Sequence, residues 1–203
     1  AGLGNVIVDY KGVVDKGLSD VMRRIENKLK RLDPREPGNT RKRWFLEAAL
    51  QGNQAVVMFS GRIADCCKEQ AEQEKDETRR RELLKLEDIC RNVPLNPART
   101  FHEAVQSIYM ILLAVHLESN GHAISLGRFD QYVYPYYKRD LEEGRITREE
   151  ALEIVECFFI KCNELNKLRS WPDTEFFLGY QMFINLAIAG QTVDGKDATN
   201  EVS

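Results

Sequence analysis

The residues of this chain with the most suitable types for chemistry are a histidine and an asparagine in glycine-rich surroundings. His122 follows Gly121, and Gly127 comes shortly after it, so a tight connection presents the imidazole. Asn5 follows Gly4 in a comparable way. Either side chain could contact a ligand. A structural histidine and ordinary asparagine turn chemistry explain the pattern equally well, so both readings stay open.

The other candidates for chemistry fit structural roles. His102 and His116 lie on a predicted buried helix, 14 residues apart, and cannot chelate a metal at one level of that helix. The cysteines are odd in number, and none belongs to a C-x-x-C motif, which argues against a disulfide framework and against a zinc site. They are Cys66, Cys67, Cys90, Cys157 and Cys162. Phosphate loops, nucleophile elbows, zinc helices and dinucleotide fingerprints are all absent from the sequence.

The composition is that of a globular protein. The chain has 203 residues, 43% of them hydrophobic, and a formal net charge of −3. This charge balance predicts no nucleic-acid partner. The most apolar stretch, Ile108 to Val115, is far shorter than the roughly 20 residues of a membrane span. No signal peptide is visible at the start, so we expect a cytoplasmic protein with no membrane partner.

Periodicity predicts a mainly α-helical chain with a few short strands. Apolar residues recur at steps of three and four along most of the sequence, and Thr147 with Glu150 has the spacing of a capping box. Residues 1–10 suggest a short extended segment, 119–130 a loop or strand, and 182–188 a strand. Residues 197–203 resemble a helix start that breaks off, which suggests truncation. The expected helices cover residues 11–32, 45–67, 68–85, 100–118, 132–143 and 147–162.

The stretch from Lys68 to Lys85 is almost entirely charged, with opposite signs interleaved. Such a pattern is typical of a solvated helix face that carries ion pairs at i,i+4 spacing. The alternative is an ionic surface that docks a partner. On that reading the chain would be an autonomous helical interaction module without catalytic activity.

Several longer runs resemble the middle of glycyl radical enzymes of the pyruvate formate-lyase-like family. Within that family, the matching runs resemble the cobalamin-independent glycerol and diol dehydratases most. The resemblance covers essentially the whole chain and predicts one partial, truncated pyruvate formate-lyase-like domain over residues 1–203. The matching runs are Gly2–Tyr10, Pro97–Phe101, Glu118–Tyr132, Tyr134–Tyr137, Asp140–Thr147, Asn185–Leu186, Gly190–Thr192 and Asp194–Glu201.

The resemblance implies a part of a ten-stranded α/β barrel wrapped in helices. In such enzymes a glycyl radical near the C-terminus oxidises a cysteine inside the barrel, and the thiyl radical abstracts hydrogen from the substrate. Loss of water, an amine or another group follows, with a glutamate two residues after the cysteine as acid or base. The resemblance also implies a small-molecule substrate, a radical S-adenosylmethionine activating enzyme and a homodimeric parent.

The sequence contains neither part of that radical machinery. A Gly-Cys-Val-Glu loop is absent, and so is a glycyl loop of the Arg-Val-Ser-Gly-Tyr type. Cys67 precedes Glu69 by two residues, but on the charged helix and outside the family's context, so we interpret the spacing as coincidence. We therefore expect no catalytic residue and no bound cofactor in these 203 residues. The radical would belong to a parent dehydratase or lyase, and the piece alone would be inactive.

Two pocket positions of the family fall inside the chain. Glycerol dehydratase has a histidine where this chain has Asn5, and it has Gly-His-Ser where this chain has Gly121, His122 and Ala123. The resemblance therefore implies that Asn5, His122 and Ala123 bind substrate. Asn5 lacks the imidazole of the family's histidine, and Ala123 lacks the hydroxyl of its serine. A polyol substrate would therefore find fewer hydrogen-bond partners, each worth roughly 1–3 kcal/mol. This argues against glycerol and favours another small hydroxylated, amino or carboxylated substrate.

Overall fold

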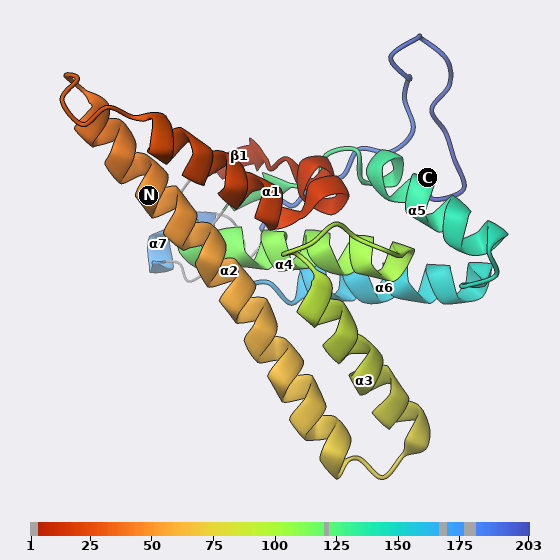
Figure 1. The fold of residues 1–203 in the computed structure, drawn as a ribbon. Helices are drawn as coiled ribbons and strands as arrows, with labels where there is room; N and C mark the ends of the chain where they lie inside the picture. Colours follow the sequence, from red (N-terminus) through yellow and green to blue (C-terminus); the bar gives the residue numbers. More distant parts are fainter. Residues whose placement is uncertain (1–3, 120–121, 167–169, 177–181) are drawn as a thin grey trace. The chain divides into compact units, whose positions relative to one another are not determined.

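The structure, a computed structural model, describes residues 4–119, 122–166, 170–176 and 182–203. They divide into two compact units, one built from residues 4–11 and the described part of 99–203, the other from residues 12–98. Most described residues are helical (Figure 1), which confirms the predicted fold class. That residues 1–203 form a single partial domain stays a prediction.

The described part of the chain contains two strands and seven helices (Figure 1). They are β1 (Gly4–Ile7), α1 (Tyr10–Arg31), α2 (Asn39–Gln73), α3 (Glu77–Asn92), α4 (Phe101–Ser119), β2 (His122–Ser125), α5 (Phe129–Glu142), α6 (Arg148–Asn163) and α7 (Trp171–Phe176).

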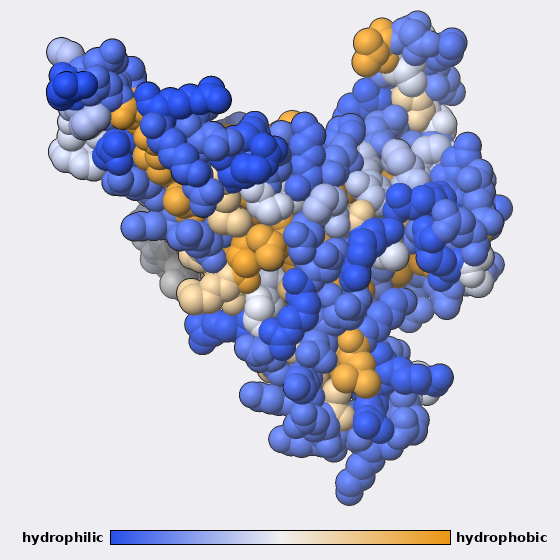
Figure 2. All heavy atoms as spheres, in the orientation of Figure 1, coloured by the Kyte–Doolittle hydropathy of each residue, from blue (hydrophilic) through white to orange (hydrophobic). Residues whose placement is uncertain are grey.

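In the unit of residues 12–98, α2 and α3 form an antiparallel hairpin. The charged stretch 68–85 is divided between the two helices. A new helix, α3, begins after Asp76, and the carboxylate of this N-cap residue accepts from Arg79 N at 2.8 Å. Arg79 and Glu82 pair on the outer surface. Figure 2 shows the arm formed by the ends of α2 and α3 as mainly hydrophilic. The stretch therefore has the character of a solvated face.

The helix predicted over 11–32 is interrupted at Gly17, which has φ 72° and ψ 165°. Leu18 N donates to the carbonyl of Pro94 at 2.8 Å, and Ser19 N donates to that of Leu95 at 2.9 Å. A β-carbon at position 17 would lie 2.3 Å from the Leu95 oxygen. Glycine is required here both by the backbone conformation and by the close approach of a second backbone.

The second unit is built around α4, which contacts α5, α6 and β2. The predicted burial of this helix is confirmed, since Phe101, Ile108 and Leu112 have no exposed surface. Asp140 of α5 accepts from Phe101 N at 2.7 Å and so caps the start of α4. The capping box that the sequence predicts at the start of α6 is also present.

Two predicted elements near the end of the chain are wrong. Residues 182–188 run beside β2 but form only an isolated parallel bridge, between Leu186 and Gly127. The donors Ala123 N and Leu126 N, which bond to the carbonyls of Met182 and Asn185, are three residues apart, whereas a regular parallel ladder repeats every two residues. Residues 197–203 are not helical: Asp197 pairs with Gln191 in an isolated antiparallel bridge, its carboxylate accepts from Thr199 N, and a turn follows at 201–202.

Among the described residues, no helix combines the length and the apolar character that crossing a membrane requires.

Candidate functional site

The pairing of β1 with β2 brings the three predicted substrate-binding residues onto neighbouring strands. The strands are parallel, with Gly4 opposite His122 and Val6 opposite Ile124. Asn5 therefore lies at the level of Ala123, although 117 residues separate Asn5 from His122 in the sequence. Gly121, which the sequence predicts to help present His122, lies outside the described residues.

The close approach of the two strands depends on a glycine. A β-carbon on Gly4 would lie 2.6 Å from the main-chain oxygen of His122 and 3.5 Å from its β-carbon. A separation under 3.0 Å is shorter than real β-carbon contacts allow, so any larger residue at position 4 would push the strands apart. This explains physically why glycine precedes Asn5.

Three neighbouring backbone segments, β1, β2 and residues 182–186, each contain a non-glycine residue with a left-handed backbone conformation. The φ angles are 58° for Asn5, 54° for Ala123 and 54° for Phe183. Ala123 N donates to the carbonyl of Met182 at 2.8 Å, so the third segment lies directly beside β2. Asparagine tolerates this conformation, whereas alanine and phenylalanine adopt it at a cost of about 1 kcal/mol or more. Backbone strain of this kind concentrates at binding sites.

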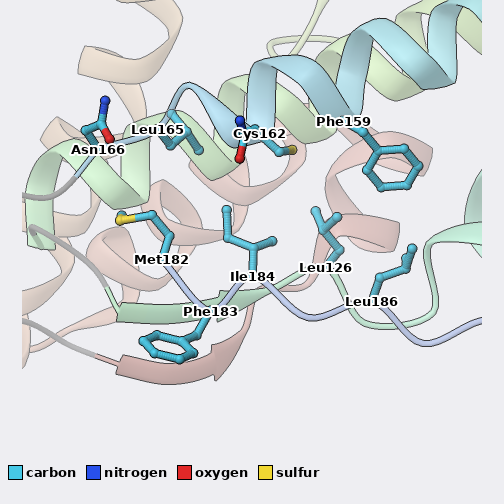
Figure 3. A pocket seen from close by; sticks show the side chains of 10 residues that line it. Leu126, Phe159, Cys162, Leu165, Asn166, Met182, Phe183, Ile184 and Leu186 are labelled. Carbon is cyan, nitrogen blue, oxygen red and sulfur yellow. The ribbon is translucent and has the colours of Figure 1, made fainter. Parts of the chain in front are cut away.

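Phe183 is a residue of this neighbourhood that the sequence reasoning missed. Its ring centroid lies 4.8 Å from that of His122, with 56° between the ring planes. Figure 3 shows the ring on the opposite side of its backbone from Met182 and Ile184. The sequence showed only an alternating segment here, and no residue in it signals the left-handed turn. The structure thus adds an aromatic wall beside the imidazole.

The substrate-binding role of Asn5, His122 and Ala123 remains a prediction, and their exposure differs. Asn5 is exposed, His122 is half-buried and Ala123 is buried, with 7% of its surface accessible. The His122 imidazole lies against the Phe183 ring, and the Asn5 amide is carried one position along the neighbouring strand. An amide and an imidazole can each donate to hydroxyl or carboxylate oxygens and accept from hydroxyls. Such a set suits a small polar molecule.

A separate pocket of about 510 Å³ lies between α6 and residues 182–186 (Figure 3). Phe183 is the one residue of the neighbourhood described above that contributes to its lining; Asn5, His122 and Ala123 do not. Apolar side chains such as Leu126, Phe159 and Ile184 line it together with the polar residues Asn163 and Asn166. We place the candidate site at the strands rather than in this pocket, because the residues that the family resemblance implies as substrate-binding lie at the strands and do not line the pocket.

Three of the cysteines have thiols that favour the protonated form. Burial raises the pKa of Cys162 to about 12. Burial and the neighbouring Cys67 raise the pKa of Cys90 to about 11. Burial also raises the pKa of Cys67, the residue that precedes Glu69 by two positions. Since the thiolate is the nucleophile, these are properties of packing residues rather than reactive ones.

We expect alkylation at pH 8 to distinguish these thiols. A thiol with a pKa near 12 is ionised there in roughly one molecule in ten thousand, against about a quarter for an ordinary cysteine. Iodoacetamide should therefore label Cys162 and Cys90 at least about tenfold more slowly than the exposed Cys157. Peptide mass spectrometry over a time course measures the rates. Equal rates for Cys162 and Cys157 would show that the half-buried thiol of Cys162 is reactive.

Comparison with known proteins agrees with the resemblance seen in the sequence. The family model described as pyruvate formate lyase-like matches residues 1–203. Isethionate sulfite-lyase of Nitratidesulfovibrio vulgaris is 40% identical over 198 residues, which cover 96% of this chain and 24% of that protein.

Two solved structures are also similar. One, described as 1,2-propanediol dehydration in Roseburia inulinivorans, has a TM-score of 0.96 and 44% identity, and the match covers 98% of this chain and 25% of that one. The B12-independent glycerol dehydratase of Clostridium butyricum has a TM-score of 0.94 and 38% identity, with 99% and 25% covered.

The chain thus spans about a quarter of the length of the curated relatives that it matches. The relatives are radical lyases and dehydratases, which favours the enzyme reading of the sequence over a helical interaction module. With a family model that matches every residue, the chain belongs to the pyruvate formate lyase-like family.

Proposed function

We propose that the protein carrying this chain is a glycyl radical lyase or dehydratase acting on a small hydroxylated or amino substrate. The chain supplies one part of the substrate site, namely Asn5, His122 and Ala123, with Phe183 as an added wall. The radical glycine and the catalytic cysteine lie outside these 203 residues. The whole protein works as a homodimer and requires a radical S-adenosylmethionine activating enzyme.

The observation that carries this proposal is the family match over all 203 residues together with the position of Asn5 beside His122 and Ala123. The relatives named above act on isethionate, 1,2-propanediol and glycerol. These molecules share a small carbon skeleton with at least one hydroxyl group. A site that offers hydrogen-bonding side chains matches that shared chemistry.

In this proposal the residues of the chain bind and orient. The imidazole of His122 and the amide of Asn5 hold a substrate hydroxyl or a carboxylate oxygen, and the Phe183 ring limits access of water. When present, the glycyl radical and its partner cysteine supply the hydrogen abstraction that starts the elimination. The side chain of Ala123 cannot form a hydrogen bond. The substrate group that faces Ala123 therefore needs no partner there, whereas a hydroxyl of glycerol would.

The test uses the full-length protein, purified anaerobically and activated. It is incubated separately with isethionate, propane-1,2-diol, glycerol and trans-4-hydroxy-L-proline, and products are measured by mass spectrometry. We expect turnover of at least one hydroxylated compound, with glycerol a poor substrate. A protein that holds its radical but converts none of these, nor amino analogues of the same size, would contradict the proposed reaction class.

A further inference from the structure

Ala189 is held in a left-handed conformation by two side chains. Its φ is 55°. Its N–H donates to Asp130 Oδ2 at 2.7 Å, and its carbonyl accepts from Arg128 Nη2 at 2.7 Å. Arg128 Nη1 also donates to the carbonyl of Gln191 at 2.9 Å. Arg128, the N-cap of α5, and Asp130, in the first turn of α5, thus bind the carbonyl and the N–H of one strained alanine.

The segment that ends at Ala189 runs along β2 and its continuation. Leu126 N donates to the carbonyl of Asn185 at 2.9 Å, and Ala187 N donates to that of Gly127 at 2.9 Å. These bonds do not form a regular ladder, since the segment pairs only through an isolated bridge between Gly127 and Leu186. With so few main-chain hydrogen bonds, backbone pairing alone specifies the register of this segment only weakly. Charge-assisted hydrogen bonds from side chains can fix it instead.

The carboxylate of Asp130 is suited to such a task. It is fully buried, and burial alone would raise its pKa. Hydrogen bonds from Ser203 Oγ at 2.6 Å, from Ala189 N and from Gln131 Nε2 hold the pKa below its usual range. The group is therefore an anion at neutral pH, and a buried anion that loses its donors is costly.

We propose that Arg128 and Asp130 are positioning residues, which set the register of residues 182–189 along β2 and thereby hold Phe183 against His122. This proposal rests on the proposed function only where it treats the surroundings of His122 and Phe183 as a substrate site. The positioning itself is a property of the 203-residue chain and can be measured without substrate.

Hydrogen exchange followed by mass spectrometry tests the register. In Asp130→Asn and in Arg128→Ala we expect the amides of residues 182–189 to exchange at least about tenfold faster than in the unmodified chain. Lys138→Ala, an exposed change on α5, is the matched control and should leave these amides unchanged. Protection of the buried helix α4, which belongs to the same unit as Arg128 and Asp130, reports that each variant is folded. If Asp130→Asn unfolds, the exposed Arg128 still provides the test.

A second readout follows the ring contact. The chain has three histidines, so the imidazole signals of His122 can be assigned by NMR against His102 and His116. The Phe183→Leu variant serves as a reference, because its spectrum gives the chemical shift of His122 when no aromatic ring lies beside it. Asp130→Asn should move the His122 signal toward that position and leave the other two in place. An Ala189→Gly change, which removes the left-handed strain, should restore part of the exchange protection lost in Asp130→Asn.

Unchanged exchange in residues 182–189 together with an unchanged His122 signal, in both Arg128→Ala and Asp130→Asn, would overturn the positioning role. That outcome would leave the proposed lyase activity standing, because neither measurement involves substrate or radical. Conversely, a protein without lyase activity could still show the full effect on register.

Discussion

Replacing His122 by alanine in the activated full-length protein is expected to slow turnover by about tenfold to a hundredfold. A substrate hydroxyl that loses its buried partner costs about 1–3 kcal/mol, and each 1.4 kcal/mol is a factor of ten in rate. The contact between the His122 and Phe183 rings is lost as well. The yield of glycyl radical should not change, because in our proposal the radical glycine lies outside these 203 residues.

Steady-state kinetics with the accepted substrate, together with radical quantification, measure this effect. His102→Gln is the control, since it alters a histidine on α4 that has no part in the proposed site. His122→Gln keeps one donor and one acceptor, and it should recover part of the lost rate. If kcat and KM stay unchanged in His122→Ala, His122 does not belong to the substrate site.

Replacing Gly17 by alanine is expected to lower the free energy of unfolding by about 3 kcal/mol or more. The backbone at this position, with φ 72° and ψ 165°, is essentially reserved for glycine, and adopting it costs other residues about 1–3 kcal/mol. A β-carbon would also lie 2.3 Å from the Leu95 oxygen and 2.7 Å from the carbonyl carbon of Asn96. These are main-chain atoms, so no side-chain movement relieves the clash.

Urea denaturation followed by circular dichroism measures the change in stability. Gly52→Ala and Gly61→Ala are matched controls, because both glycines lie inside α2 and a β-carbon there meets nothing within 4 Å. Each control should stabilise the chain by about 0.5–1 kcal/mol, since alanine favours a helix more than glycine does. An urea midpoint for Gly17→Ala equal to that of the unmodified chain would mean that the kink is not required.

The helices could be predicted because apolar periodicity and capping residues are local signals. The buried face of α4 and the capping box at Thr147 follow directly from residue types at helical spacing. The kink at Gly17 could not be predicted, since it depends on the backbone of Leu95 and Asn96, far along the chain. The short helix α7 was likewise not recognised in the sequence.

The candidate site was only partly predictable. Periodicity gives no reason to pair residues 4–7 with 122–125, because parallel pairing across more than a hundred residues leaves no local pattern. The family resemblance supplied that link for Asn5 and His122. The left-handed residues Ala123, Phe183 and Ala189 could not be foreseen, since neither alanine nor phenylalanine signals a positive φ. Their conformations depend on hydrogen bonds from neighbouring segments.

We propose that this chain forms part of the substrate site of a glycyl radical lyase and does not itself hold the radical. Electron paramagnetic resonance after anaerobic treatment with the activating enzyme and reductant tests this directly. The full-length protein should show a glycyl doublet, and the 203-residue chain treated in the same way should show none. A doublet in the 203-residue chain would place the radical on one of its 13 glycines. A full-length protein without a doublet would remove the glycyl radical from the mechanism. Either result would overturn this proposal.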